Sequence, residues 1–322
     1  MAQYRVMLQM PYTPGIASIF DNHPEIAVEQ FTETSEANIV QHIGNYDAAI
    51  LGVAPFTPAI IGKADKLKIV ARHGVGYDAV NVPALTKAGI PLAVVGTANS
   101  ITVAEHSLFF MLALAKRAFL FDREARKGNW DIRREVPACD LAGRKALVLG
   151  YGRIGRRLVP MLNAMQMDVY VYDPYVIQDA IVTAGATPVE DFRAVLGAMD
   201  FVSVNCPKDE TTTGMIARAE IAAMKPTAFL VNTARGGIID EADLYDGLKR
   251  DVIAGAGIDP FVVEPPSPDH PLFSLDNIVV SPHSAGNTEE SMFRMGAAAA
   301  RNVVDCFNGK LNPDNVINKE VL

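Results

Sequence analysis

Residues 145–149 (Lys-Ala-Leu-Val-Leu) lead directly into residues 150–155 (Gly-Tyr-Gly-Arg-Ile-Gly), and a helical pattern begins at Arg156. A short apolar run, a Gly-x-Gly-x-x-Gly turn and a helix together are typical of a unit that binds a dinucleotide. The glycines permit a tight turn, close approach of the backbone to a pyrophosphate, and tight packing of the helix on the strand. The helix N-terminus adds unpaired N–H groups and the positive end of its dipole. The turn residues expected to contact the cofactor are Gly150, Gly152, Arg153, Ile154 and Gly155.

A carboxylate follows one strand later, where such a site needs it. The next apolar run, 169–172, ends in Asp173, which can accept hydrogen bonds from the ribose hydroxyls of an adenosine. It would also repel a 2′-phosphate, and neither Pro174 nor Tyr175 offsets that charge. We therefore expect NAD rather than NADP. A glycine turn beside a surface Asp, or a Rossmann methyltransferase, would fit the same segment less fully.

The rest of the chain alternates short apolar runs with longer amphipathic stretches. Runs that are apolar on both faces and separated by helical patterns indicate parallel sheets covered by helices. The sequence therefore predicts two α/β sheets. The expected strands are 5–10, 47–53, 67–72 and 91–95 in a first series, and 145–149, 169–172, 201–204, 228–232, 255–258 and 278–280 in a second.

A long helix is expected between the two series. Residues 102–105 (Thr-Val-Ala-Glu) form a capping-box pattern, which predicts a helix that begins at Thr102 and ends near Gly128. Its first half is apolar almost all round and is expected to be buried, whereas residues 116–127 are charged enough to reach solvent.

Composition and charge exclude several classes of partner. The 322 residues carry 29 Lys and Arg against 37 Asp and Glu, a net charge of −8, and 49% are hydrophobic. This is the composition of a folded chain with an ample core, of about two domains at roughly 150 residues each. An acidic balance gives no support for binding to phosphate backbones. The apolar stretch 108–115 is far shorter than the roughly 20 residues that span a bilayer. We expect neither nucleic acid nor membrane as a partner.

The N-terminus and the cysteines indicate the compartment. Residues 1–10 lack the basic start, apolar run and cleavage site of a secretory signal. Cys139, Cys206 and Cys306 are odd in number and widely spaced, which gives neither a disulfide framework nor a zinc ligand set. We expect a cytoplasmic protein without a metal site.

Three segments place reactive side chains just after predicted strands: 231–237 with Arg235, 257–265 with Asp259 and Glu264, and 281–286 with His283. Ligands of doubly wound sheets bind at the carboxyl ends of the strands, so these segments are expected to converge. Reduction of a 2-oxo acid needs a cation for the carboxylate, a proton donor for the carbonyl and a hydride from a cofactor. Arg235 can clamp an oxyanion, and His283 backed by Glu264 can exchange the proton.

These segments resemble the D-2-hydroxyacid dehydrogenase family, which includes D-lactate, glycerate, hydroxypyruvate and phosphoglycerate dehydrogenases. The resemblance covers almost the whole chain. Besides the glycine turn, it rests on residues 72–78 (Arg-His-Gly-Val-Gly-Tyr-Asp), 103–106 (Val-Ala-Glu-His), 282–283 (Pro-His) and 316–318 (Val-Ile-Asn).

The resemblance implies an NAD-dependent 2-hydroxyacid dehydrogenase with Arg235 as substrate clamp, His283 as general acid/base and Glu264 as its partner. Asp259 would hold the nicotinamide carboxamide, and the amides of Val75 and Gly76 would contact the substrate carboxylate. Other implied cofactor contacts are Thr102 on the nicotinamide side, Asn205, Cys206 and Pro207 beside the adenine, and Thr233, Ala234, His283 and Ala285.

The family architecture would be a Rossmann doubly wound parallel sheet, residues 102–285, inserted in a smaller flavodoxin-like α/β domain. That substrate-binding domain would be discontinuous, 1–101 and 286–322, and a homodimer would form through the NAD-binding domain. A non-enzymatic, NAD-responsive corepressor built on the same scaffold would keep the same Arg, Glu and His.

The substrate is expected to be a small unphosphorylated acid. Phosphoglycerate dehydrogenases carry an Arg-Ser-x-Thr segment where residues 51–57 (Leu-Gly-Val-Ala-Pro-Phe-Thr) stand here, so a phosphate would meet no cation there. The end at Leu322 also leaves no room for the regulatory domain of many such enzymes. Phosphoglycerate remains the alternative, because another cation could substitute. A formate dehydrogenase is disfavoured, because that branch of the family has Gln in place of Glu264.

Smaller expectations concern side chains around this site. Phe56 is expected to narrow the substrate pocket, and His73 either to line it or to pack in the core. His106 is expected to be a packing residue inside its helix, and His270 a solvated loop residue.

Overall fold

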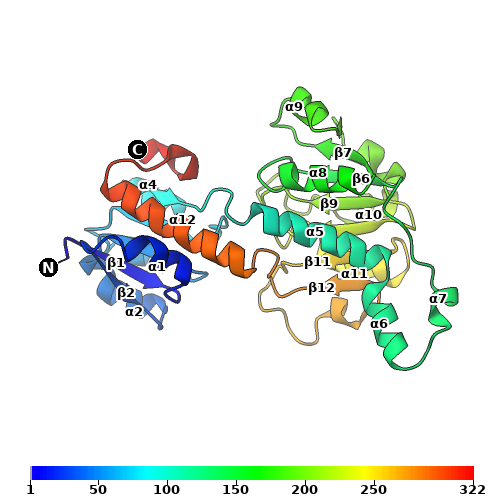
Figure 1. The fold of residues 1–322 in the computed structure, drawn as a ribbon, viewed down its shortest axis with the longest axis horizontal. Helices are drawn as coiled ribbons and strands as arrows, with labels where there is room; N and C mark the ends of the chain where they lie inside the picture. The colour runs from blue at the N-terminus through cyan, green and yellow to red at the C-terminus, as the bar shows by residue number, and fades with distance from the viewer. Residues whose placement is uncertain (1) are drawn as a thin grey trace. The chain divides into compact units, whose positions relative to one another are not determined.

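The computed structural model describes residues 2–322, which form two compact units. The first consists of the residues up to Asn99 together with Asn287–Leu322, and the second of Ser100–Gly286. Each unit has its own parallel sheet with helices on both faces (Figure 1). The α/β prediction is therefore confirmed.

The first unit is built on a five-stranded sheet in the order β2-β1-β3-β4-β5. This order is that of flavodoxin-like folds. Helices α1 and α12 cover one face, where they bury Ile16 and Val303, and α2, α3 and α4 cover the other. Its elements are β1 (Tyr4–Gln9), α1 (Pro14–Phe20), β2 (Ile26–Gln30), α2 (Glu36–His42), β3 (Ala48–Leu51), α3 (Pro58–Ile61), β4 (Ile69–Arg72), α4 (Val82–Lys87), β5 (Leu92–Ala93) and α12 (Glu289–Phe307).

The second unit is built on a seven-stranded sheet in the order β12-β11-β10-β9-β6-β7-β8. The strand order reverses between β6 and β9, as in a Rossmann fold. Its strands are β6 (Lys145–Leu149), β7 (Asp168–Tyr172), β8 (Thr187–Pro188), β9 (Phe201–Val204), β10 (Phe229–Asn232), β11 (Gly255–Ile258) and β12 (Ile278–Val280). Its helices are α5 (Ser100–Ala115), α6 (Ala118–Arg126), α7 (Ile132–Glu135), α8 (Gly155–Ala164), α9 (Gln178–Thr183), α10 (Arg218–Ala223) and α11 (Glu241–Lys249).

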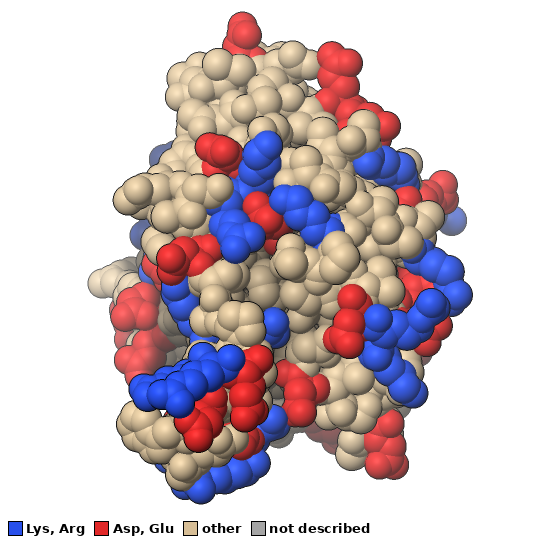
Figure 2. Space-filling view, turned by 90° about the vertical axis from the view of Figure 1, so that its right-hand side faces the viewer, with Lys and Arg blue, Asp and Glu red and all other residues tan. Residues whose placement is uncertain are grey.

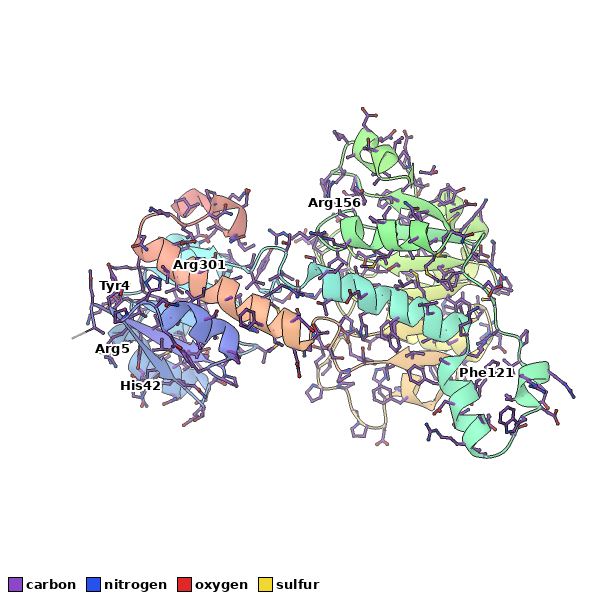
Figure 3. The ribbon with its side chains drawn as sticks, viewed as in Figure 1. Tyr4, Arg5, His42, Phe121, Arg156 and Arg301 are labelled. Atoms are coloured by element: carbon purple, nitrogen blue, oxygen red, sulfur yellow. The ribbon has the colours of Figure 1, made fainter. Side chains whose placement is uncertain are left out.

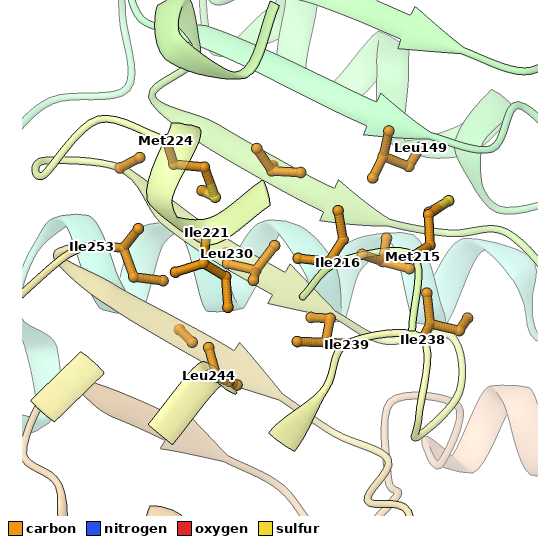
Figure 4. Close-up of a cluster of buried hydrophobic side chains, with 14 of the residues drawn as sticks. Leu149, Met215, Ile216, Ile221, Met224, Leu230, Ile238, Ile239, Leu244 and Ile253 are labelled. Atoms are coloured by element: carbon orange, nitrogen blue, oxygen red, sulfur yellow. The ribbon is translucent and has the colours of Figure 1, made fainter. Parts of the chain in front are cut away.

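Helices on the two faces of the second sheet enclose separate cores. On one face α10 and α11 place Ile221 and Leu244 against β9, β10 and β11, and Figure 4 shows this cluster. On the other face α5 and α8 bury Phe110 and Leu158. None of the helices within residues 2–322 is both long and apolar enough to cross a membrane.

Two edge strands, β2 and β8, are not among the strands predicted from the sequence. β2 has an exposed second half and lies at the edge of its sheet, so it lacks a continuous apolar run. β8 has two residues, one of them proline, and pairs with β7 alone. The two-sided apolar pattern marks strands that are covered on both faces, and neither of these is.

The prediction of one helix from Thr102 to about Gly128 is wrong at both points. The helix begins at Ser100, so Thr102 is a buried residue of its first turn and not a cap. It ends at Ala115, because Arg117 adopts a left-handed conformation (φ 50°) and α6 starts in a new direction. The guanidinium of Arg117 donates to the carbonyl of Ala254 (3.4 Å), a contact across the fold that sequence periodicity does not register.

Charged side chains are distributed over the surface of this unit in both signs. The face turned to the viewer in Figure 2 shows Lys and Arg interspersed with Asp and Glu. Ion pairs of this unit include Arg123 with Asp276 (2.7 Å) and Arg126 with Asp122 (2.9 Å).

Candidate active site

The residues predicted to carry chemistry in the second unit lie at one edge of its sheet. All of its strands run parallel, so the segments that follow them emerge on the same side. The residues just past the strand ends are Gly150 after β6, Asp173 after β7, Asn205 after β9, Thr233 after β10, Asp259 after β11 and Ser281 after β12. This edge is where doubly wound sheets bind ligands.

Glycine is needed at each of the three positions of the turn for a different structural reason. Gly150 has φ 99°, and a Cβ there would lie 2.8 Å from the amide nitrogen of Cys206. A Cβ on Gly155 would lie 2.2 Å from the carbonyl oxygen of Gly150, so this glycine lets α8 pack on the turn. A Cβ on Gly152 would meet nothing within 4 Å among the described residues. Gly152 thus faces open space, where a pyrophosphate can approach the backbone.

Unsatisfied backbone donors surround that space. Neither the amide of Gly152 nor that of Ile154 donates to an acceptor within residues 2–322, and Ile154 caps α8 without a side-chain hydrogen bond. A helix start with free N–H groups is a ready site for an anion. The turn therefore fits the phosphates of a dinucleotide.

Alanine substitutions distinguish Gly152, which leaves room for the cofactor, from Gly155, which allows α8 to pack on the turn. We expect Gly152→Ala to melt at the wild-type temperature but to bind NADH at least about tenfold more weakly, because its methyl group occupies the space for the pyrophosphate. The matched variant Gly155→Ala is expected to lose about 3 kcal/mol of stability through the clash with Gly150. Thermal melts and NADH fluorescence titrations measure both; equal behaviour of the two variants would contradict this assignment.

Asp173 lies at the end of β7 with its carboxylate directed back over the turn. It accepts hydrogen bonds from the amides of Tyr151 (2.7 Å) and Tyr175 (2.9 Å). The guanidinium of Arg156, which is labelled in Figure 3 at the start of α8, lies 4.7 Å from the centre of the Tyr151 ring.

The segment 205–207, predicted to pass beside the adenine, lies against the glycine turn through Asn205 and Cys206. The side-chain oxygen of Asn205 is buried without a partner in the described structure. Burial raises the pKa of the Cys206 thiol to about 11, so it stays protonated and packs as a small apolar group. The carbonyl of Pro207 accepts from the hydroxyl of Thr212 (2.7 Å).

His283 and Glu264 form the pair that the sequence predicts. Nδ1 of His283 lies 2.7 Å from Oε2 of Glu264, and half of the histidine side chain is exposed (49%). The second carboxylate oxygen of Glu264 accepts the amide of Phe261 (3.0 Å), which fixes the direction of the carboxylate. A carboxylate at Nδ1 leaves Nε2 of the imidazole for a substrate.

The loop that carries Glu264 is held by residues that the sequence does not single out. Glu241 accepts the amide of Val262 (2.7 Å) and pairs with His270 (3.3 Å). His270 packs edge-on against the ring of Phe261. The expectation of a solvated His270 is therefore wrong: only 20% of its side chain is exposed, because the aromatic cluster covers it.

Arg235 follows β10 on a loop that touches the Glu264 loop closely. The side chain of Asn232 holds this loop by donating to the carbonyl of Arg235 (2.9 Å) and accepting the amide of Ala234 (2.9 Å). A Cβ on Gly236 would lie 2.1 Å from the carbonyl oxygen of Phe261, so glycine is required where the two loops meet. The hydroxyl of Thr233 is hydrogen-bonded to that of Ser107 on α5 (2.7 Å).

Asp259 is almost fully buried (1% exposed) and organises the segment after β12. Its carboxylate accepts the hydroxyl of Ser281 (2.5 Å) and the amides of Ser284 (2.7 Å) and Ala285 (3.0 Å). Its carbonyl accepts the amide of His283 (3.2 Å). The predicted cofactor contacts Asp259 and Ala285 are thus directly linked.

In the first unit, the loop after β4 presents unsatisfied donors. The amides of Val75 and Gly76 donate to no acceptor among the described residues. The guanidinium of Arg72 donates to the carbonyls of Gly76 (2.7 Å) and Leu51 (3.3 Å), which holds this loop against the end of β3. Two free amides on a braced loop suit a carboxylate.

Two side chains of this region that the sequence suggests as pocket residues, Phe56 and His73, are largely buried. Phe56 is fully buried in the core beneath α3 and α4, so it does not narrow a pocket. Val53 is the exposed apolar side chain of that segment (89%). His73 is mostly buried, and burial lowers its pKa, opposed by a hydrogen bond to the backbone of Met292. Its Nε2 is buried without a partner in the described structure.

No group of three or more His, Cys, Asp or Glu side chains within residues 2–322 is arranged to hold a metal ion.

Residues 108–285 match the family model of the D-isomer specific 2-hydroxyacid dehydrogenase NAD-binding domain. The chain belongs to the D-isomer specific 2-hydroxyacid dehydrogenase family. The match confirms the predicted family and its NAD cofactor.

Individual members of this family differ in name and length. The chain is 35% identical over 88% of its length to D-3-phosphoglycerate dehydrogenase of Archaeoglobus fulgidus, but spans only 54% of that protein. It is 34% identical over 89% of its length to glyoxylate reductase of Korarchaeum cryptofilum and covers 87% of it. An acyclic imino acid reductase solved with NADPH and D-Arg superimposes with a TM-score of 0.86 at 25% identity, covering 97% of this chain and 99% of that one. The chain thus spans about half the length of the phosphoglycerate dehydrogenases that it matches.

Proposed function

We propose that the protein is an NAD-dependent dehydrogenase that transfers a hydride between NAD(H) and a small unphosphorylated 2-hydroxy or 2-oxo acid of the D series. The observation that carries this proposal is the 2.7 Å contact between His283 and Glu264 at the sheet edge that also holds the dinucleotide turn. An imidazole oriented by a carboxylate beside a dinucleotide site is suited to proton exchange coupled to hydride transfer.

Each part of the site has a role in this reaction. Bound NADH supplies the hydride. Arg235 holds the substrate carboxylate and the carbonyl oxygen, and stabilises the negative charge that develops on that oxygen. His283 donates a proton from Nε2 to the same oxygen, while Glu264 stabilises the imidazolium through Nδ1. In the direction of oxidation, His283 accepts the hydroxyl proton.

The remaining predicted contacts complete the binding scheme. The free amides of Val75 and Gly76 are proposed donors to the substrate carboxylate, and residues 1–101 with 286–322 the substrate-binding domain. Residues 102–285 would hold the cofactor, with Thr102, Thr233 and Ala234 on the nicotinamide side.

An unphosphorylated substrate is supported by the segment 51–57. It contains no Lys or Arg, and Val53 presents an apolar side chain to solvent there. A phosphate group would carry nearly two negative charges past this segment without a cation from it.

The experiment that tests the proposal is NADH oxidation with a panel of glyoxylate, hydroxypyruvate, longer 2-oxo acids and phosphohydroxypyruvate. We expect turnover with at least one unphosphorylated acid and a higher kcat/KM for it than for the phosphorylated compound. A preference for phosphohydroxypyruvate would replace the substrate assignment with phosphoglycerate. No turnover with any acid, while NADH still binds, would favour a corepressor-like binding protein.

Cofactor choice is predicted to depend on Asp173. Asp173→Asn keeps an acceptor for the amide of Tyr151 but removes the charge that repels a 2′-phosphate. We expect the preference for NADH over NADPH, measured as a ratio of kcat/KM values, to fall at least about tenfold, or roughly 1.4 kcal/mol. An unchanged ratio would show that another group excludes the 2′-phosphate.

We further propose a homodimer through this domain. Phe109 on α5, Phe119 on α6 and Trp130 before α7 are 44%, 56% and 66% exposed, and the rings of Phe109 and Phe119 contact each other. Clustered exposed aromatic side chains are typical of subunit interfaces.

The three cysteines are free thiols, which suits a reducing cytoplasm.

The dimer is tested by light scattering of the wild type and Phe119→Glu. A charge in place of the Phe119 ring is expected to shift micromolar samples from dimer to monomer. Tyr175→Glu, at an exposed position outside the cluster, is the matched control. A wild type that is monomeric at these concentrations would overturn the proposal.

A further inference from the structure

Helix α5 reaches the catalytic segment after β12 through His106. Nε2 of His106 lies 3.0 Å from the hydroxyl oxygen of Ser281, two residues before His283. The same hydroxyl lies 2.5 Å from Oδ1 of Asp259. A continuous line of polar contacts therefore runs from α5 through Ser281 to the carboxylate that organises the His283 segment.

The hydrogens in this line have one consistent arrangement. A carboxylate can only accept, so the single proton of the Ser281 hydroxyl is donated to Asp259. The hydroxyl oxygen must then accept from His106, which requires a proton on Nε2. Burial lowers the pKa of His106, opposed by the charge of Asp259, so the ring is neutral near pH 7 with Nδ1 unprotonated. Each group in the line thus has a defined role as donor or acceptor.

Aromatic packing supports the His106 ring in this position. It packs edge-on against Phe110, with 4.5 Å between the ring centres. Phe110 in turn fits against Gly257 of β11, where a Cβ would lie 2.7 Å from the phenyl ring. The absence of a side chain at Gly257 lets α5 approach the sheet closely enough for His106 to reach Ser281.

The segment that this line supports is strained. His283 has φ 52°, a left-handed conformation that few residues other than glycine adopt. Strained conformations persist when surrounding contacts hold them in place. The amide of His283 donates to the backbone carbonyls of Ser281 (3.0 Å) and Asp259 (3.2 Å), and the amides of Ser284 and Ala285 donate to the Asp259 carboxylate. The Asp259 carboxylate thus holds the two residues directly after His283, and the Asp259 and Ser281 carbonyls hold His283 itself.

We propose that His106 and Ser281 are positioning residues for the reaction: they orient Asp259, which keeps His283 in its strained conformation facing Glu264. This inference rests on the proposed function for its kinetic consequence but not for its structural one. Neither His106 nor Ser281 needs to touch the substrate.

The kinetic test uses His106→Phe, which keeps an aromatic ring against Phe110 and removes the donor, together with Ser281→Ala and Ser281→Thr. We expect His106→Phe and Ser281→Ala to lower kcat by roughly 10- to 100-fold, since a misplacement of about 1 Å can cost that much. Ser281→Thr, which retains the hydroxyl, should recover most of the loss. Glu105→Gln, at the exposed neighbouring position of α5, is the matched control and should behave as wild type.

A second readout does not need turnover. The ¹⁵N resonances of the His283 ring report whether Nδ1 still shares a proton with Glu264, and NADH titrations report whether the domain is folded. We expect this signature to be lost in His106→Phe and Ser281→Ala and kept in Ser281→Thr, with NADH binding retained in all three.

The outcomes separate the inference from the proposed function. Variants that keep kcat within about twofold and leave the His283 resonances unchanged would overturn the positioning role. So would a Ser281→Thr that behaves like Ser281→Ala. If the wild type reduces no 2-oxo acid, the proposed function fails, and the resonances alone decide the positioning role. If His106→Phe does not fold, the result for Ser281→Ala alone tests the positioning role.

Discussion

Replacing His283 by alanine is expected to lower kcat for 2-oxo acid reduction by between about 10² and 10⁴ at neutral pH. The substitution removes the group that we propose gives a proton to the carbonyl oxygen. It also leaves the Glu264 carboxylate without its 2.7 Å partner. Because the imidazole does not contribute to the fold of the dinucleotide turn, NADH affinity should stay close to that of the wild type.

Steady-state kinetics and NADH titration measure this prediction, and Glu264→Gln is its graded control. Glutamine keeps an oxygen that can accept from Nδ1 but carries no charge, so we expect a loss between those of wild type and His283→Ala. A His283→Ala protein that retains full activity would show that another group donates the proton. Because the left-handed conformation at residue 283 disfavours side chains, His283→Gly is a useful second variant that removes the strain as well.

Replacing Arg235 by lysine is expected to lower kcat/KM for the 2-oxo acid by about 10² to 10³, or roughly 3 to 4 kcal/mol of transition-state stabilisation. A guanidinium can contact the carboxylate and the carbonyl oxygen at the same time, whereas an ammonium is a point charge. The loss should appear in both KM and kcat, because the proposed clamp would bind the ground state and also stabilise the developing oxyanion.

Lys208 provides a matched control for this prediction. It is an exposed cation whose amine would lie 3.0 Å from a Cβ on Gly237, close to the Arg235 loop. If Arg235 acts through its specific contacts, Lys208→Gln should change kcat/KM much less than Arg235→Lys does. Equal losses from the two substitutions would indicate that the general positive charge of this region, and not the clamp, binds the substrate.

Local patterns in the sequence were sufficient for most of the second unit. The run 145–155 reads as strand, turn and helix, and the structure has β6 and α8 at those positions. β9 and β11 agree with their predicted bounds, because strands covered on both faces are continuously apolar. β12 also agrees, although it lies at the edge of the sheet and is only partly covered. The predicted pairing of Glu264 with His283 also has its counterpart in the structure, although the two residues lie on different loops.

Features that depend on contacts between distant segments could not be predicted from local sequence patterns. Phe56 looks like a pocket residue from its neighbours in the chain, yet it is fully buried. His106 looks like a packing residue, and its packing against Phe110 agrees with that, but its bond to Ser281 joins residues far apart in the chain. Periodicity also extends α5 through residue 117, where a tertiary contact of Arg117 accompanies the turn.

The sequence by itself determined the fold class, the family resemblance and the chemically reactive side chains, because these depend on residue types and on spacings within one strand and the loop after it. The tertiary structure alone decided how those side chains are supported. Asp259, Ser281 and His106 come together because β11, β12 and α5 pack side by side, and the absent side chain at Gly257 sets how closely they do so. Such support depends on distances between elements, which no local pattern encodes.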